Sequence, residues 1–389
     1  MIPSARLAAV PEYPFARWAA DCRAAVERGA DLIRLDIGNP DLPPPRAVID
    51  AACEALRLPE THRYPGYRGS PELREAICAR YARRFGVSLD PDTQVACLLG
   101  SKEGIVHLQQ AILDPGDAVL LPDPGYTPYE AGAGLSQATI VRFSLRAEAA
   151  HRPALDRIPS EIARRAKAVW LNYPNNPTGA VAGPNAFADA IDFARSHDLL
   201  ICHDAPYAEI RHDGGEPASV LQVPGAADVA IEFNSLSKTF NMAGWRIGYA
   251  VGNADAIQLL RRIKSNVDSG MFLPLQRAAV AALRTEDDWI DERNAVYRER
   301  LDILAEASRG IGLAVEVPPA THYLWARLPE GRAAEPFARK LLDEVGVVVA
   351  PGTFFGSRGE GFVRVSATAP TDRIVEASER LERCRSWTR

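Results

Sequence analysis

The stretch NSLSKTFNMAGWRIG, residues 234–248, places two serines, a lysine and an arginine close together directly after an apolar run. These residues are Ser235, Ser237, Lys238 and Arg246, and little opposite charge lies among them. One interpretation is a solvated loop. The other is an anion site, beside which Lys238 is held for some purpose other than its charge.

Two other apolar runs also end in polar clusters, namely VWLNYPNNPTG and LLICHDAPY. Asn176, Asp204 and Lys238 are 28 and 34 positions apart (204 − 176 and 238 − 204). Each interval is about one strand–helix unit of roughly 30 residues. Because the carboxyl ends of parallel strands line one edge of an open sheet, we expect an amide, a carboxylate and an amine to meet in one cleft.

A fourth cluster, LLGSKEGIVHLQQAIL, is typical of a strand, a glycine turn and the start of a helix. Free backbone N–H groups at a helix start, with Ser101 and Lys102 beside them, favour a phosphate. The cluster contains neither GxxxxGK[ST] nor GxGxxG, so neither a nucleoside triphosphate nor a dinucleotide is indicated. The predicted ligand has one phosphate and a part that uses an acid, an amide and an amine.

Pyridoxal 5′-phosphate meets each of these demands. Lys238 can form an imine with its aldehyde, and Asp204 can keep its pyridine nitrogen protonated. Asn176 and Tyr207 can donate hydrogen bonds to the phenolic oxygen, and Tyr126 of DPGYTPY can stack on the ring. Each residue alone has a plainer interpretation, such as a helix cap, a turn or packing. Together and in this order, they indicate the cofactor.

The elements that must position these residues follow an alternating pattern of short apolar runs and longer helical segments, which predicts an α/β fold with a mostly parallel sheet and helices on both faces. The expected strands are QVACLLG, DAVLLP, ATIVRFSL, AKAVWLNY, LLICHD, DVAIEFNS and GYAVG. The expected helices are 103–113, 184–197, 254–264 and much of 287–308. We expect a large cofactor-binding domain at residues 46–285, and a smaller α+β domain that combines residues 1–45 with 286–389.

The bulk composition is ordinary for a soluble globular protein, because 47% of the 389 residues are hydrophobic and 24% are charged. A formal net charge of −5 gives no basic footprint for nucleic acid. No apolar run approaches the roughly 20 residues that span a bilayer, and no signal-like segment is seen, so we expect a cytoplasmic protein. The six cysteines have no CxxC spacing, and His203 has no second histidine at ligand spacing, so we expect no metal site.

Several stretches resemble the fold-type I aminotransferases of class I/II, and the resemblance covers nearly the whole chain. The stretches are NYPNNPTGAV, HDAPYAEI, SLSKTFNMAGWRIGYAVGN and FVRVS. Within that family the chain is most similar to LL-diaminopimelate aminotransferases, through IGNPDLPPP, HRYPGYRGSPELREAI, LLGSKEGI, PDPGY and IKSNVDSG. IGNPD and NMAGWRIG also resemble alanine (glutamate–pyruvate) aminotransferases.

The resemblance implies a role for each matching residue around the cofactor, with Lys238 bearing it and acting in catalysis together with Asp204 and Tyr126. The residues implied to hold the phosphate are Ser101, Lys102, Ser235, Ser237 and Arg246. The residues implied to hold the ring are Tyr126, Asn176, Asp204 and Tyr207.

The resemblance also implies the substrate side of the site. Arg364 would bind the substrate α-carboxylate with its planar two-bond fork. The other implied substrate residues are Tyr13, Gly38, Lys102 and Asn176. Tyr64 would reach the phosphate in the neighbouring subunit, which implies a homodimer with shared sites.

The implied function is a two-step exchange of an amino group between an L-amino acid and a 2-oxo acid, with LL-diaminopimelate and 2-oxoglutarate as the preferred pair. Alanine/glutamate–pyruvate or aspartate transamination is the alternative, and a lyase, decarboxylase or oxidase reaction could use the same cofactor. A regulator that senses the cofactor would need an added DNA-binding domain. Pro206, Arg211, His212 and the bulky SGMFLPLQ depart from the family pattern and leave the distal end of the substrate open.

Overall fold

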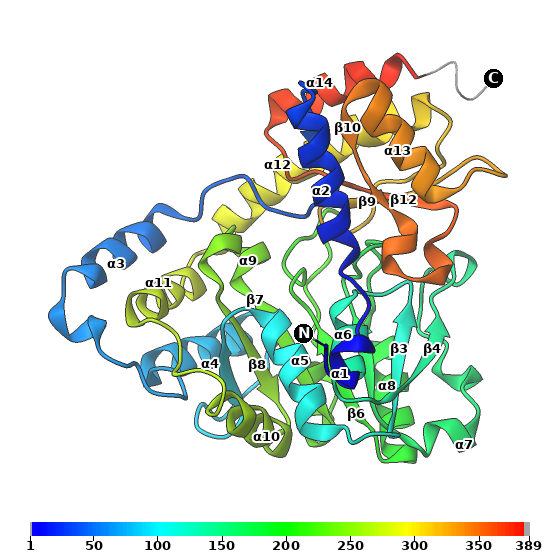
Figure 1. The fold of residues 1–389 in the computed structure, drawn as a ribbon. Coiled ribbons are helices and arrows are strands. Elements are labelled where there is room, and N and C mark those ends of the chain that lie inside the picture. Colours follow the sequence, from blue (N-terminus) through cyan, green and yellow to red (C-terminus); the bar gives the residue numbers. More distant parts are fainter. Residues whose placement is uncertain (1, 385–389) are drawn as a thin grey trace.

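The computed structural model describes residues 2–384, and its central element is a seven-stranded sheet in the order β2-β8-β7-β6-β5-β3-β4 (Figure 1). The strands are β2 (Val95–Leu98), β3 (Ala118–Asp123), β4 (Thr139–Ser144), β5 (Ala166–Asn172), β6 (Leu200–Asp204), β7 (Ala230–Ser235) and β8 (Gly248–Gly252). Strands β7, β6, β5, β3 and β4 are parallel, while β8 is antiparallel to both of its neighbours. The predicted mostly parallel sheet is confirmed.

Helices cover both faces of this sheet, which explains why its strands are apolar runs without alternation. On one face lie α5 (Ser101–Ile112), α6 (Pro128–Leu135) and α10 (Ala254–Lys264), in a cluster with Trp170 and Phe233. On the other face lie α4 (Pro71–Phe85), α8 (Pro184–His197) and α11 (Leu273–Leu283), in a second cluster. The sheet is therefore buried from both sides, and its strand ends are the places where polar groups reach a surface.

Helix α3 (Arg46–Leu56) projects on one side of the molecule and packs against α11 (Figure 1). A short turn of 3₁₀-helix, η1 (Pro59–His62), follows α3 and leads to α4.

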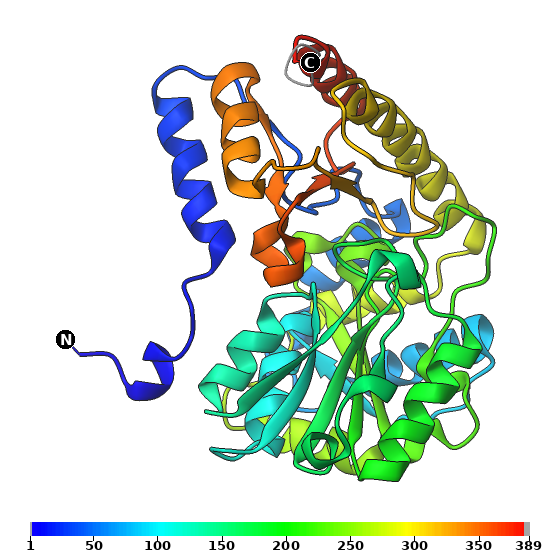
Figure 2. The same ribbon diagram turned by 90° about the vertical axis from the view of Figure 1, so that its right-hand side faces the viewer.

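A second group of elements lies beyond the carboxyl ends of the parallel strands (Figure 2). Its strands are β1 (Ile33–Arg34), β9 (Tyr323–Arg327), β10 (Val347–Val348), β11 (Ala350–Pro351) and β12 (Phe362–Ser366). Strands β11, β12 and β9 form an antiparallel sheet, and β1 pairs with β10 in parallel. The helices are α2 (Pro14–Glu27), α12 (Asp287–Gly310), α13 (Ala334–Val345) and α14 (Thr371–Glu382).

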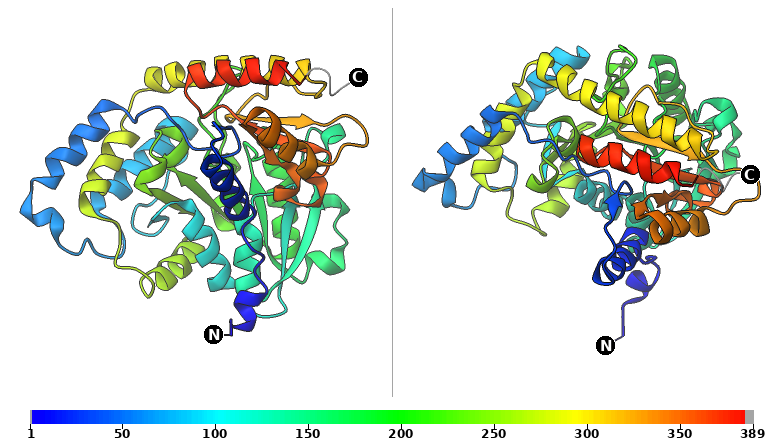
Figure 3. Two further views of the ribbon diagram at one scale, coloured as in Figure 1. Left: turned by 45° about the horizontal axis from the view of Figure 1, so that its top comes forward. Right: turned by 90° about the horizontal axis from the view of Figure 1, so that it is seen from above.

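This second group has a hydrophobic core of its own, which joins Trp18 of α2 to Leu301, Leu341 and Ile374 of the three later helices. Helices α12 and α14 lie side by side (Figure 3). Helix α1 (Ala5–Ala8), in the segment that precedes α2, lies apart from this core and contacts α6, one of the helices that cover the large sheet. The domain boundaries expected at residues 45/46 and 285/286 stay a prediction.

The remaining elements are short. They are α7 (Ser160–Ala163), α9 (Leu236–Thr239), η2 (Ala147–Ala149), η3 (Leu155–Arg157), η4 (Val220–Gln222), η5 (Ala226–Asp228), η6 (Ala243–Trp245), η7 (Gly352–Phe355) and η8 (Ser357–Gly359). Across residues 2–384, none of the helices combines the length and the apolar character that crossing a membrane requires.

The buried carboxylate of Glu232 on β7 is the shared hydrogen-bond partner of groups from α4, β6 and the segment around η4. Glu232 accepts hydrogen bonds from the Tyr81 hydroxyl at 2.6 Å and the Val220 backbone N–H at 3.0 Å. It also accepts from the Ser219 hydroxyl at 2.9 Å and lies 2.8 Å from His203 Nδ1. His203 belongs to this buried structural network.

We predict that Glu232→Ala lowers the free energy of unfolding by about 3 kcal/mol, because it leaves several buried polar groups without their shared acceptor. Urea unfolding followed by circular dichroism measures the loss. Glu148→Ala, at an exposed position, is the control, with an expected change below about 0.5 kcal/mol. A loss for Glu232→Ala as small as that of the control contradicts this account.

Candidate active site

The ends of three neighbouring parallel strands bring the predicted functional residues together. Asn172 ends β5, Asp204 ends β6 and pairs in register with Asn172, and Lys238 lies in α9 directly after β7. They line one cavity. Its lining is Ser101, Lys102, Tyr126, Asn172, Asn176, Asp204, Pro206, Tyr207, Ser235, Ser237, Lys238, Ala243 and Arg246. Every predicted cofactor residue except Tyr64 is therefore in this one place.

Asp204 is a buried carboxylate in which one oxygen accepts a hydrogen bond and the other has no hydrogen-bond partner. Its Oδ2 accepts a hydrogen bond from the Tyr129 hydroxyl at 2.8 Å, while Oδ1 is buried and has no partner. The Asn172 side chain donates to the backbone carbonyl of Asp204 at 2.7 Å and fixes the strand end. Burial raises the pKa of Asp204 to about 6, although the bond from Tyr129 opposes the shift. A cationic group against Oδ1 would favour the charged carboxylate.

Lys238 is a largely buried amine whose Nζ donates a hydrogen bond to the backbone carbonyl of Gly38. Burial lowers the pKa of Lys238 to about 7, and the positive charges of Arg364 and Arg246 act in the same direction. A large share of this amine is therefore uncharged near neutral pH. An uncharged amine can act as a nucleophile and as a base.

The other end of the cavity is suited to an anion. Helix α5 begins at Ser101 without a side-chain cap, so N–H groups of its first turn remain free to bind one. Arg246 Nη1 lies 3.4 Å from the Ser237 hydroxyl oxygen. The same guanidinium lies against Gly100, where an added Cβ atom would be only 2.2 Å from Arg246 Nη2. Burial and the charge of Arg246 both lower the pKa of Lys102.

Two of the predicted substrate residues, Lys102 and Asn176, are part of the lining, and the other three lie next to it. Arg364 on β12 is 3% exposed and donates to Asn176 Oδ1 at 2.7 Å, while its Nε has no partner. Gly38 lies where no Cβ fits, because the Tyr323 hydroxyl would be 1.8 Å away. Lys102 Nζ lies over the Tyr13 ring, 4.3 Å from the ring centroid. Each of these residues contacts one residue of the cavity lining: Arg364 contacts Asn176, Gly38 contacts Lys238, and Tyr13 contacts Lys102.

Some singled-out residues are not brought into the cavity. Tyr64 is 88% exposed on the loop that follows η1. Arg211 forms an ion pair with Asp213 at 2.8 Å, and His212 donates to the backbone carbonyl of Thr321 at 2.6 Å. Of the departures from the family pattern in HDAPYAEIRHDG, only Pro206 lines the cavity.

Tyr129, Asn172 and Tyr323 belong to the site, and sequence reasoning missed all three. Tyr129 lies three positions after Tyr126 in the same DPGYTPY stretch, and this closeness could have marked it as a second candidate. Asn172 is the last polar residue of its strand and could have been found in the same way as Asp204. Tyr323 lies 3.0 Å from the Tyr207 hydroxyl, oxygen to oxygen, but the two are 116 positions apart and no local signal joins them.

Comparison with known proteins identifies the family. Residues 30–381 match the model described as aminotransferase class I and II. The chain belongs to this family. It is a transaminase, and its cofactor is pyridoxal 5′-phosphate.

Similar proteins cover almost the whole chain. The LL-diaminopimelate aminotransferase of Desulforudis audaxviator is 48% identical over 98% of both chains. That of Moorella thermoacetica is 47% identical over 97% of both chains. Among solved structures, substrate-bound BacF from Bacillus subtilis is similar with a TM-score of 0.95, at 36% identity and 98% coverage of both chains.

The residues of the cavity fit the cofactor of this aminotransferase family. The unpartnered Oδ1 of Asp204 suits a protonated pyridine nitrogen, and the Lys238 amine suits an aldehyde. The free start of α5, together with Ser237 and Arg246, suits a phosphate.

We predict that, in cofactor-free protein, labelling of Lys238 by an amine-reactive reagent rises with pH through a midpoint near 7. The lowered pKa makes the reactive uncharged amine dominant above that pH. Peptide mass spectrometry measures the labelled fraction. Arg364→Met should move the midpoint upward, because it removes a positive charge that disfavours protonation of Lys238. A midpoint near the ordinary lysine value of 10.5 contradicts the burial argument.

Proposed function

We propose that this aminotransferase moves the amino group of LL-diaminopimelate to 2-oxoglutarate. Two relatives with that activity in their names are 47% and 48% identical to the chain. The structural observation that carries the proposal is a second cavity beside the first. LL-diaminopimelate is long and has an ammonium and a second carboxylate at its far end, so the enzyme must provide space and charges for both.

The second cavity lies between the N-terminal segment and α6, and Lys102 lines it as well as the first cavity. Tyr13 lines it beside Lys102, and three further charged residues line it: Glu12, Glu130 and Arg142. Arg142 Nη2 lies 2.8 Å from Glu130 Oε1. Carboxylates for an ammonium and a guanidinium for a carboxylate are thus available in one space that adjoins the cofactor cavity.

When bound, pyridoxal 5′-phosphate supplies an aldehyde that receives the amino group and a ring that withdraws electrons from the substrate α-carbon. Lys238 Nζ removes the proton from that α-carbon, and its lowered pKa leaves a large share of the amine uncharged for this task near neutral pH. Positioned proton transfer of this kind is worth about 10²–10⁴-fold in rate.

The other cavity residues hold the cofactor in our proposal. Asp204 would pair through Oδ1 with the pyridine nitrogen, Tyr126 would stack on the ring, and Asn176 and Tyr207 would bind its phenolic oxygen. The phosphate would be held by Ser101, Lys102, Ser235, Ser237 and Arg246. Asn176, Asp204, Tyr207, Ser235 and Ser237 are buried, so water screens their electrostatic interactions only weakly. Lys102 and Arg246 are exposed, which leaves the phosphate end of the cavity open to solvent.

Arg364 binds the α-carboxylate that all amino-acid and 2-oxo-acid substrates share. Its guanidinium is buried and bonded to Asn176 Oδ1 and to the Asp36 carbonyl, and both contacts fix its plane. Its free Nε and the adjacent Nη can then offer two parallel bonds. Gly38 and Tyr13 line the substrate side.

We further propose a homodimer in which Tyr64 reaches the phosphate of the neighbouring subunit. Support comes from exposed apolar side chains around α3 and the segment before α11, including Leu56 at 47%, Tyr67 at 56% and Phe272 at 39% exposure. Large apolar side chains exposed in this way are suited to burial against a protein partner. All six cysteines are free, which supports a reducing compartment such as the cytoplasm.

Asp204→Asn should retain the fold yet lower kcat by about 10²–10³-fold, because an amide cannot stabilise a positive charge on the ring. Steady-state kinetics with far-UV circular dichroism measures both effects. Asp213→Asn is the matched control, since Asp213 pairs with Arg211 outside the cavity. Near-full activity of Asp204→Asn would mean that this carboxylate does not face the cofactor.

The substrate itself is tested by a panel of amino acids with 2-oxoglutarate as the acceptor. LL-diaminopimelate should exceed alanine in kcat/KM by about 10⁴-fold, because polar groups built for its distal charges reject analogues that lack them. Lysine and ornithine, which lack the distal carboxylate, should be poor. A kcat/KM for alanine equal to or above that for LL-diaminopimelate rejects the proposal and leaves the assignment as an aminotransferase intact.

A further inference from the structure

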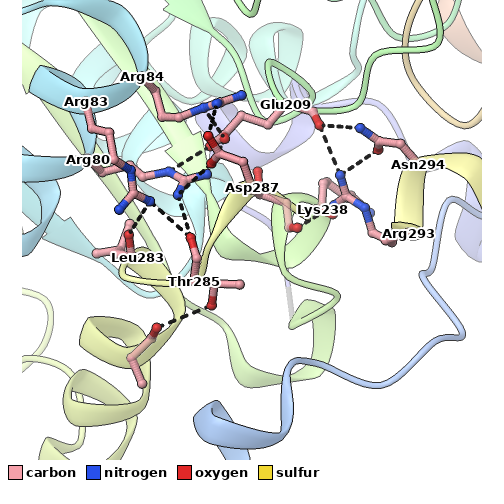
Figure 4. Close-up of polar contacts among 12 residues, drawn as sticks. Arg80, Arg83, Arg84, Glu209, Lys238, Leu283, Thr285, Asp287, Arg293 and Asn294 are labelled. Carbon is pink, nitrogen blue, oxygen red and sulfur yellow. Dashed lines mark hydrogen bonds and ion pairs between the residues drawn. The ribbon is translucent and has the colours of Figure 1, made fainter. Parts of the chain in front are cut away.

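A buried arginine behind the active site connects two of the segments that form it (Figure 4). Arg293 lies on α12 and is 3% exposed. Its Nη1 donates to the backbone carbonyl of Lys238 at 2.8 Å and also to that of Thr239. Its Nη2 donates to the backbone carbonyl of Glu209 at 3.0 Å. One guanidinium therefore binds the backbone of two chain segments that both contribute residues to the cavity lining.

The acceptors that Arg293 binds are all uncharged oxygens, because its remaining hydrogen bond goes to Asn294 Oδ1 at 2.7 Å. The nearby carboxylate of Glu209 is engaged by Arg80 and Arg84, with Arg84 Nε 3.0 Å from Oε2. Figure 4 shows this carboxylate turned toward the two arginines, while the backbone carbonyl of Glu209 faces Arg293. Burial lowers the pKa of Arg293 to about 10, so it stays charged at neutral pH.

A buried cation bonded only to neutral oxygens is costly for stability, and an apolar residue could fill the same space at a smaller cost. Local geometry gives a reason for the arginine. Helix α9 has four residues and ends at Thr239, so its last carbonyls have no partner within a continuing helix. Arg293 binds two of these carbonyls, those of Lys238 and Thr239.

The other backbone group that Arg293 binds, the carbonyl of Glu209, belongs to the segment after β6. Glu209 follows Tyr207 by two positions and Asp204 by five, and Asn294 Nδ2 also donates to its carbonyl at 3.1 Å. Arg293 and Asn294 thus fix the spacing between the turn that carries Lys238 and the segment that carries Tyr207.

We propose that Arg293 is a positioning residue that sets the place of Lys238 relative to the cofactor cavity by binding the carboxyl end of α9 and the segment after β6. The inference rests on the proposed role of Lys238. A displacement of about 1 Å at a reacting group can cost on the order of 10²-fold in rate, so a small shift of α9 has a measurable effect.

Two variants and one matched control test the proposal. Arg293→Met removes the donors at similar volume, and Arg293→Lys keeps a charge with a single donor group. Arg300→Met is the control, because Arg300 lies two turns further along α12, is 2% exposed and pairs with Asp41 at 2.6 Å. Both methionine variants lose a buried guanidinium, but only Arg293 binds the backbone of Lys238.

The first readout is the rate at which cofactor-free protein attaches added pyridoxal 5′-phosphate covalently, followed by visible absorbance. The others are kcat and KM with the full enzyme, and urea unfolding. Arg293→Met should attach the cofactor and turn over about 10- to 100-fold more slowly, with a KM changed far less than kcat. Arg293→Lys should fall between Arg293→Met and the wild type. Arg300→Met should lose stability but keep the wild-type attachment rate and kcat.

Wild-type attachment rate and kcat in Arg293→Met overturn the proposal, whatever stability is lost. If Arg293→Met does not fold, Arg293→Lys decides: slower attachment supports the proposal, and wild-type values overturn it. An equal slowing in Arg300→Met also overturns it, since the effect would then be a general consequence of a weakened α12. Failure of the wild-type protein to attach the cofactor at all would instead contradict the proposed function.

Discussion

The active site depends on keeping an acid and an amine buried in one cavity without letting them neutralise each other. Asp204 is bonded to Tyr129, and Lys238 donates to the Gly38 carbonyl. Burial moves both pKa values toward neutrality, to about 6 for Asp204 and about 7 for Lys238. Each group is therefore poised to change its charge when a ligand enters, which is what a transaminase requires of them.

Both the parallel sheet and the second group of elements position the residues of the site. Asn172 and Asp204 end adjacent parallel strands, so their separation is set by the sheet. Arg364 and Gly38 come from the second group and reach this edge through Asn176 and Lys238. Arg293 of α12 supports the same edge from behind. The predicted cofactor residues of the cavity thus come from the large sheet and its helices, while Arg364, Gly38 and Tyr13 on the substrate side come from the second group and its N-terminal segment.

Much of the fold could be predicted from the sequence, because the strands are continuous apolar runs separated by helices with clear starts. The convergence of Asn176, Asp204 and Lys238 followed from spacing alone. The contact between Arg364 and Asn176 spans 188 positions, so local pattern could not predict it and the family resemblance was needed to suggest the role of Arg364. Arg293 was missed because its partners are backbone carbonyls, which leave no signal in the sequence.

The central claim is that Lys238 is the residue that bears the cofactor. The most direct measurement is borohydride reduction of the protein with pyridoxal 5′-phosphate bound, followed by peptide mapping of the modified lysine. We expect the modified peptide to contain Lys238, because its amine is largely buried, lines the cavity and has a pKa lowered to about 7. Modification of Lys102, the other lysine of the cavity lining, in place of Lys238 would contradict the account.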